Sequence, residues 1–407
     1  MSTARRSLMA GHTPRDVLRR GTIVAVIAFL TLIDLFGSQA LLPRLVSAYG
    51  VDAAAMGVAV NASTLGMAAS GLLVGWFADR LDRKAWIWRC LALLAIPTAL
   101  LGVVESVEGF LLLRIVQGMF MAAAFTLTLT HLSEQCDVTA AGGAMAAYVT
   151  GNVASNLFGR VLAVSAADVF GLSGSFYAFA VLNLSGAVLA FVLIGARDAE
   201  PPQRSGPALA IWRAHLGDAA LRPAFLIGFL ILFVFVGVFT YVNFHLTQSF
   251  TLDPALLGLV YLVFAPALLT TPFAGQAVAR QGPRRVFLVS GLAALGGVGL
   301  TLVPSLALVL AGLALIGAGT FFMQAAATNY ISRTAKAERA AANGLYLTSY
   351  YLGGLVGAAL LGQAQTAGGW ALVAAVVVLA LGAALLLSGC LASPGPQLGH
   401  DPGPDTA

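Results

Sequence analysis

Long apolar runs are the feature that most constrains the fold of this chain. Twelve such runs follow one another, separated by short polar segments or by Pro and Gly residues. A helix needs about 20 apolar residues to cross the hydrocarbon core of a bilayer. Only 10% of the 407 residues are charged, against about 25% in a typical soluble domain. We therefore predict an all-α integral membrane protein with twelve transmembrane helices.

The runs fall into two sets of six on either side of a polar stretch. We expect a cytoplasmic tail at 1–21, a six-helix bundle at 22–195, a cytoplasmic central loop at 196–221, a second bundle at 222–391, and a disordered cytoplasmic tail at 392–407. The expected spans are 22–45, 57–78, 86–104, 108–131, 142–167, 174–195, 222–246, 255–277, 285–304, 306–330, 340–364 and 368–391.

The distribution of Lys and Arg predicts the orientation. With both termini inside, 19 of the 22 basic residues lie at the cytoplasmic ends of the spans or in cytoplasmic segments, where such residues are retained. The three exceptions are Arg44, Arg114 and Arg160. The bias does not invert along the chain, so an even number of helices in the cell membrane is expected.

The two halves resemble each other at an offset near 200 residues. GWFADRLDRK begins at Gly75, and GQAVARQGPRR begins at Gly275. AYVTGNVASNLFGRVL begins at Ala147, and LYLTSYYLGGLVGAAL begins at Leu345, 198 positions later. Since six is even, the repeats share one orientation. This predicts a pseudo-twofold axis along the membrane normal and a central cavity between the halves.

Two of these segments resemble motifs of the major facilitator superfamily. The stretch after helix 2 matches the signature loop of that family at Gly75, Asp79, Arg80, Arg83 and Lys84, while Asp82 stands where Gly is usual. In helix 4, LLLRIVQGMFMA is similar to a second family motif, with Arg114, Gln117 and Gly118 in the matching places. The resemblance spans the chain and implies two six-helix bundles that transport a solute by alternating access.

Helix 5 partly resembles the Gly-rich motif of proton-driven exporters. Gly142, Gly151 and Gly159 are in step with it, whereas Asn156 and Arg160 stand where Pro and Gly are usual. The overall pattern is similar to a bacterial efflux branch of the superfamily that works as a proton antiporter.

Three charged residues lie deep in the predicted spans, all in the first half: Asp34, Arg114 and Arg160. A charge at the centre of a bilayer costs about 2.5–3.5 kcal/mol on insertion scales, so such residues are usually functional. Asp34 lies near the midplane and is the candidate proton carrier. The resemblance implies that Arg114 tunes proton transfer, with Arg160 either assisting or binding a substrate anion. The alternative is a structural ion pair between Asp34 and one arginine.

Neutral polar residues in the spans are candidates to line the cavity: Gln39, Asn61, Gln117, Asn152, Asn156, Asn243, Gln324 and Asn329. Each could equally form a hydrogen bond between helices. The aromatic candidates for stacking on a substrate are Phe125, Phe239, Tyr241, Phe321, Tyr350 and Tyr351, against the alternative of simple packing.

The signature loop predicts a cytoplasmic latch. Asp79 is placed to accept hydrogen bonds from amides at the start of helix 11, and Arg80 or Arg83 to pair with Glu134 or Asp137. Such a latch would stabilise the outward-open state. The alternative is a group of solvated charges without a conformational role.

The sequence favours a proton-coupled secondary transporter that exports a small organic compound. The alternative is an uptake symporter or a uniporter, and two deep arginines against one carboxylate would suit an anionic solute. No P-loop is present, and the scattered His and Cys residues suggest no metal site. We expect a monomer in the lipid bilayer that is not an enzyme, needs no cofactor and binds no nucleic acid.

Overall fold

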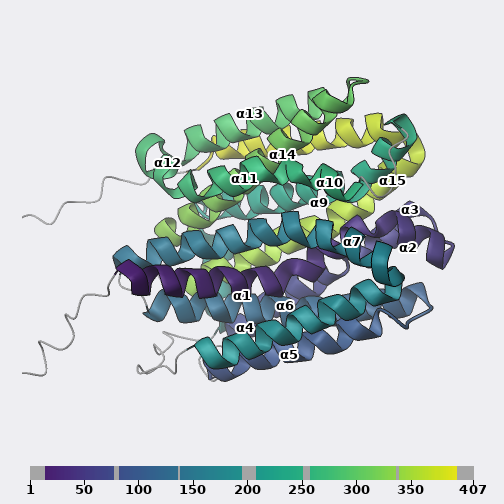
Figure 1. Cartoon of the computed structure of the whole chain (residues 1–407). Coiled ribbons are helices and arrows are strands. Elements are labelled where there is room, and N and C mark those ends of the chain that lie inside the picture. Colours follow the sequence, from purple (N-terminus) through teal and green to yellow (C-terminus); the bar gives the residue numbers. More distant parts are fainter. Residues whose placement is uncertain are drawn as a thin grey trace, which may run out of the picture.

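The computed structural model describes residues 14–77, 82–135, 138–194, 208–250, 257–335 and 339–391, and every regular element in them is a helix. The helices lie roughly side by side in two groups (Figure 1). Helices α1 to α7 make up one group, and α9 to α15 make up most of the other. The predicted all-α fold with two bundles is confirmed.

The first bundle begins with a bent span. Helix α1 (Pro14–Ala40) meets α2 (Leu42–Tyr49) at 60°. The remaining elements of this bundle are α3 (Ala53–Asn61), α4 (Ser63–Phe77), α5 (Arg83–Leu100), α6 (Val107–Gln135) and α7 (Val138–Leu193). Helix α8 (Ala208–Gly217) lies within the segment predicted as the central loop.

Before its last helix, α15, the second bundle contains three regular helices and one interrupted span. The three regular helices are α9 (Arg222–Phe250), α13 (Pro283–Thr301) and α14 (Leu306–Thr334). The interrupted span consists of α10 (Leu257–Val260), η5 (Tyr261–Phe264), α11 (Ala265–Thr270), η6 (Thr271–Phe273) and α12 (Ala274–Gln281). Pro266 and Pro272 lie at the starts of α11 and η6, and proline lacks the N–H that a continuous helix requires.

Helix α7 and helix α15 (Arg339–Ser388) are each too long for one crossing, at 56 and 50 residues. Each is interrupted by a glycine with positive φ, 75° at Gly171 and 62° at Gly369. Glycine adopts this conformation without the steric penalty of a Cβ atom. Figure 1 shows α7 turning back on itself. The two glycines are 198 positions apart, the separation that the sequence repeat predicts.

Eight helices in the described ranges are long and apolar enough to cross a membrane, or nine if the bent α1–α2 pair counts as one span. Helix α5 covers most of another predicted span, 86–104, but is not among these eight. It carries three basic residues, Arg83, Lys84 and Arg89. Because α7 and α15 each supply two predicted spans, every predicted span has a helical counterpart. The structure is consistent with twelve crossings.

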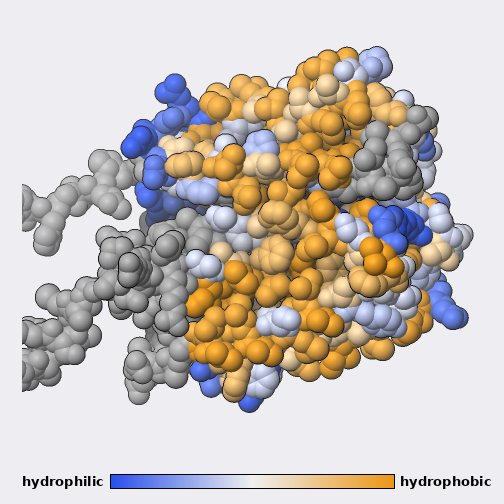
Figure 2. Space-filling view, in the orientation of Figure 1, coloured by the Kyte–Doolittle hydropathy of each residue, from blue (hydrophilic) through white to orange (hydrophobic). Residues whose placement is uncertain are grey.

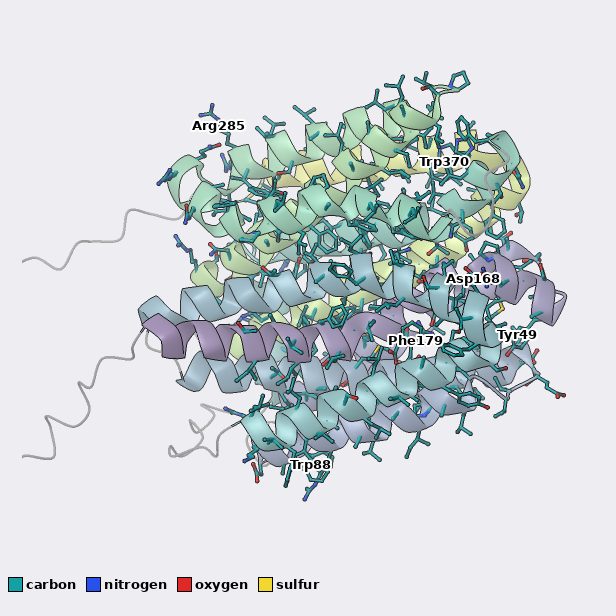
Figure 3. All side chains as sticks on the ribbon, in the orientation of Figure 1. Tyr49, Trp88, Asp168, Phe179, Arg285 and Trp370 are labelled. Carbon is teal, nitrogen blue, oxygen red and sulfur yellow. The ribbon has the colours of Figure 1, made fainter. Side chains whose placement is uncertain are left out.

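The surface has the banding of a membrane protein. Figure 2 shows hydrophobic residues over the flank of the molecule and hydrophilic residues near its two ends. Arg285 lies at the end where α1 begins, whereas Tyr49, Asp168 and Trp370 lie at the other end (Figure 3). At that far end Arg44, one of the three exceptional basic residues, forms an ion pair with Asp168.

Glycines allow equivalent helix pairs to pack closely in the two halves. A Cβ atom on Gly159 of α7 would lie 2.8 Å from the carbonyl oxygen of Ile33 in α1. A Cβ atom on Gly357 of α15 would lie 2.4 Å from the carbonyl oxygen of Phe233 in α9. Small residues at such contacts let membrane helices approach each other. The Gly-rich segments therefore specify the α1–α7 and α9–α15 contacts.

We predict that Gly353→Ala destabilises the protein. A Cβ atom at Gly353 would lie 1.9 Å from the carbonyl oxygen of Phe229, and overpacking costs about 1–3 kcal/mol. The matched control on the same helix is Gly382→Ala, where nothing lies within 4 Å of the new Cβ. Thermal unfolding in detergent should show a lower midpoint for Gly353→Ala and an unchanged or higher one for Gly382→Ala. Equal midpoints would contradict close packing of α9 on α15.

Candidate functional site

Asp34 is the centre of a buried polar network inside the first bundle. The residue is 1% exposed, and its Oδ2 atom accepts hydrogen bonds from Thr98 Oγ1 at 3.0 Å, Gln117 Nε2 at 3.0 Å and Asn183 Nδ2 at 2.7 Å. The three donors come from α5, α6 and the second part of α7. The other oxygen, Oδ1, is buried and has no hydrogen-bond partner. One face of this carboxyl group is thus satisfied and the other is free.

The hydroxyl group of Thr98 lies within hydrogen-bond distance of two acceptors. Thr98 Oγ1 lies 3.0 Å from Asp34 Oδ2 and 2.8 Å from the carbonyl oxygen of Leu94. A hydroxyl carries one proton and two lone pairs, so it can donate to only one of them at a time. Thr98 Oγ1 also accepts hydrogen bonds from Gln117 Nε2 at 2.8 Å and Asn183 Nδ2 at 3.2 Å. Rotation of the Thr98 hydroxyl towards Leu94 would therefore remove one donor from Asp34 Oδ2, and the free Oδ1 atom is the oxygen that could take a proton without displacing a donor.

Arg114 reaches Asp34 through Gln117 rather than by a direct ion pair. Its guanidinium group donates to Gln117 Oε1, to the carbonyl oxygen of Val60 at 2.8 Å and to Ser63 Oγ at 3.0 Å. Its only hydrogen bond to Asp34 among the described contacts is a long one of 3.5 Å, to the backbone oxygen. Gln117 accepts a hydrogen bond from Arg114 and donates one to Asp34. It therefore links the two opposite charges, and we call this link the relay.

Arg160 is the centre of a second network, which connects the two bundles. Arg160 is 0% exposed. It donates to Gln39 Oε1 at 2.5 Å, to Asn156 Oδ1 at 3.0 Å and to the carbonyl oxygen of Phe239 at 3.1 Å. Since Phe239 lies in α9, the arginine of the first bundle is held partly by the second.

Gln39 and Asn61 extend this network across the same interface. Gln39 Nε2 donates to Asn61 Oδ1 at 2.7 Å, and Asn61 Nδ2 donates to Thr240 Oγ1 at 3.2 Å. Both amides are 0% exposed. Helices α1, α3, α7 and α9 therefore meet in one continuous set of hydrogen bonds.

Four aromatic rings surround the Arg160 guanidinium group. Its Cζ atom lies 4.6 Å from the ring centroid of Tyr261, 5.5 Å from that of Phe264, and 5.7 Å from those of Phe36 and Phe239. Cations within about 6 Å of a ring centroid are attracted by the negative face of the ring. Three of the four rings belong to the second bundle. We call these four rings and Arg160 the arginine cage.

The other predicted polar residues are more dispersed. Asn152 lies one turn before Asn156 on α7 and is 9% exposed. Asn243 accepts a hydrogen bond from Tyr261 of the cage at 2.9 Å. Gln324 and Asn329 lie on α14 and are partly buried, and among the described residues no hydrogen bond joins their side chains to Asp34 or Arg160.

The predicted latch falls largely outside the described residues. Asp79, Arg80 and Asp137 lie outside them, as does the side chain of Glu134. Gly75 lies near the end of α4, Arg83 is buried at the start of α5 and Lys84 follows it half-buried. The predicted tails also lie mostly outside the described ranges. The latch remains a prediction.

Sequence reasoning missed several partners in these networks. Thr98, Asn183 and Ser63 contact the predicted charges but were not candidates. Asn183 could have been found, because an amide inside an apolar run is the same signal that singled out Asn61. Thr98 and Ser63 carry no such signal, since serine and threonine often satisfy themselves by bonding to the preceding turn of their own helix.

These buried networks, in two bundles of membrane-spanning helices, define a multi-pass membrane protein with polar and charged groups on and beside its pseudo-twofold interface. The sequence profile of the Major Facilitator Superfamily matches residues 24–265 and residues 242–405. The chain belongs to this superfamily and is a membrane transporter, not an enzyme.

Curated relatives align over most of their length. The chain is 30% identical to the inner membrane transport protein YnfM of Escherichia coli (strain K12) over 385 residues, covering 92% of each chain. It is 26% identical to the uncharacterized MFS-type transporter YybF of Bacillus subtilis (strain 168), covering 89% of this chain and 91% of that one.

Solved structures share the fold at lower identity. A bacterial homologue of the human lysosomal transporter Spinster, in an inward-facing and occupied conformation, superposes with a TM-score of 0.69 at 14% identity and covers 94% of this chain and 95% of its own. A mutant of the nucleoside transporter NupG gives 0.69 at 17% identity, with 91% and 98% covered.

We predict that Gln117→Leu destabilises the first bundle. The leucine removes the relay and leaves a buried donor of Arg114 and the carboxylate of Asp34 each short of one partner, at about 1–3 kcal/mol for each unsatisfied group. The control is Gln363→Leu on α15, where the glutamine is exposed. Unfolding by sodium dodecyl sulfate should occur at a lower detergent fraction for Gln117→Leu alone. Equal stability of the two variants would show that the relay contributes nothing.

Proposed function

We propose that this protein is a proton-coupled secondary transporter of a bacterial inner membrane and that Asp34 carries the coupling proton. The observation that supports this most is the environment of its carboxyl group, which has three neutral donors on one oxygen, a free second oxygen and no direct cation. A permanently ionised structural carboxylate would be expected to be paired directly with an arginine, because burial penalises an unpaired charge.

Helix α1 offers a physical route from the proton to the conformational change. Asp34 and Gln39 lie five residues apart on α1, one in each network. Protonation of Asp34 weakens the acceptor that holds Thr98, Gln117 and Asn183. A shift of α1, together with the part of α7 packed on it, would then change the position of Arg160 against Phe239 at the interface between the bundles. The proton would bias alternating access because it binds the two arrangements with different affinity.

Export is the direction that the Gly-rich helix-5 motif favours. Gly151 and Gly159 pack against backbone oxygens of α1, since added Cβ atoms would lie 2.2 Å from Ala25 O and 2.8 Å from Ile33 O. The same contact would make α1 and the first part of α7 move together. The alternative is an uptake symporter or a uniporter, which Arg160 favours because it occupies a motif position where exporters have glycine.

The test is proton flux in proteoliposomes containing an internal pH dye, with a panel of cationic, neutral and anionic solutes. Solute addition should change the internal pH for wild type, and Asp34→Asn should abolish that change while keeping solute binding. The direction of the pH change distinguishes export from uptake. The matched control is Asp168→Asn, since Asp168 is an exposed partner of Arg44 at the far end and should leave the flux intact.

Two outcomes would overturn the proposal. Solute transport without any pH change would leave a uniporter. Coupled flux that persists in Asp34→Asn would place the proton on another group and reduce Asp34 to a structural role.

A further inference from the structure

The arginine cage holds a positive charge without a counter-ion. Within the described residues no carboxylate lies within 4 Å of the Arg160 guanidinium group. Asp34 is engaged by donors in the first bundle, with Arg114 as its nearest cation. The described part of the second bundle, residues 222–250, 257–335 and 339–391, contains no Asp or Glu at all. Fully buried cations in proteins are normally paired.

The polar groups around Arg160 are also unbalanced in kind. Its three hydrogen bonds go to neutral oxygens, and its other close polar neighbour is the neutral Tyr261 side chain. Asn156 Nδ2 and Asn243 Nδ2 are buried donors without a partner. Asn156 contacts Arg160 directly, and Asn243 contacts the cage through Tyr261. Asn152 Oδ1, one turn away on α7, is the neighbouring buried acceptor without a partner. The groups that contact the cage thus include more hydrogen-bond donors than acceptors. A ligand that satisfies these donors must carry hydrogen-bond acceptors.

From this excess of positive charge and of donors we propose that the transported solute is an organic anion with a flat, apolar body, whose carboxylate is bound by Arg160. The carboxylate would accept two parallel hydrogen bonds from the planar guanidinium group, taking the N–H group that now donates to the Phe239 carbonyl oxygen. Asn156 Nδ2 and Asn243 Nδ2 are placed to supply further donors. The rings of Phe36, Phe239, Tyr261 and Phe264 offer a surface for the apolar part.

This inference rests on the proposed function and gives it a substrate class. It also gives the cage a place in coupling, because three of its rings and one of its acceptors come from the second bundle. A bound carboxylate would compete with the Phe239 carbonyl oxygen for the guanidinium group. Anion binding would therefore loosen one contact that joins the bundles.

The experiment compares each of three aromatic carboxylates with its own amide, using benzoate, 2-naphthoate and indole-3-carboxylate. The amide keeps shape and apolar area and removes the charge. Binding to the purified full-length protein is measured by isothermal titration calorimetry. At least one carboxylate should bind about 30-fold or more tightly than its amide, the ratio expected for a buried charged hydrogen-bonded pair.

Two variants keep the test independent of misfolding. Arg160→Lys keeps the charge but loses the planar fork, so it should weaken carboxylate binding while the protein stays monodisperse. Asn156→Asp supplies an internal carboxylate beside Arg160 without removing the arginine, so it should abolish the preference for carboxylate over amide. Arg44→Lys, at the exposed far end, is the control and should bind as wild type.

Failure of this inference can be told apart from failure of the proposed function. Equal binding of all carboxylates and amides, or carboxylate preference that survives Asn156→Asp, would overturn the anion site even if a cationic solute drives proton flux through Asp34. Carboxylate binding that depends on Arg160 but never drives proton flux would support the site and overturn proton coupling.

Discussion

The cost of burying charge in an apolar environment is the constraint on which the rest of this structure depends. Asp34, Arg114 and Arg160 are all 0–1% exposed, and each must find partners inside the protein. Their hydrogen-bond partners are neutral amides, hydroxyls and carbonyl oxygens rather than opposite charges, and one of them, the Phe239 carbonyl oxygen, comes from the second bundle. This leaves two arginines against one carboxylate, and the imbalance is concentrated at Arg160, between the bundles.

Helix α1 takes part in both polar networks, the one around Asp34 and the one around Arg160. The Asp34 network lies within the first bundle and its donors come from α5, α6 and α7. The Arg160 network lies one to two turns further along α1 and ends on α9. Because α1 contributes Asp34 to the first network and Gln39 to the second, we propose that a change in charge at Asp34 would be transmitted as a change in position at Gln39. Gly151 and Gly159 let α7 pack closely against the backbone of α1.

Much of this could be predicted from the sequence because it follows from composition and spacing. The apolar runs, the offset near 200 residues and the three deep charges are visible without coordinates. The positive φ of Gly171 and Gly369 falls where the repeat places two equivalent turns. The positions of the deep charges can be predicted from the sequence because few charged residues occur within membrane-spanning helices.

The grouping of these residues could not be predicted, because it depends on how helices rotate about their axes. The sequence left two roles open for Arg160, assisting the proton at Asp34 or binding a substrate anion, and it did not indicate that Asp34 and Arg160 lie in separate networks. Gln117 had two open roles, lining the cavity or forming a hydrogen bond between helices, and in the structure it bridges Arg114 and Asp34. The broken span from α10 to α12 brings Tyr261 and Phe264 to Arg160, and no period in the sequence indicates which ring faces which helix. Single residues are therefore predictable here, whereas their partners are not.

The central claim is that Asp34 changes its protonation state within an otherwise intact network. Infrared difference spectroscopy of the reconstituted protein, recorded across a change from alkaline to acidic buffer, tests it most directly. The account predicts that a protonated carboxyl band appears in wild type and in Asp168→Asn but is missing in Asp34→Asn. A wild-type spectrum without that band, or one that Asp34→Asn leaves unchanged, would contradict it.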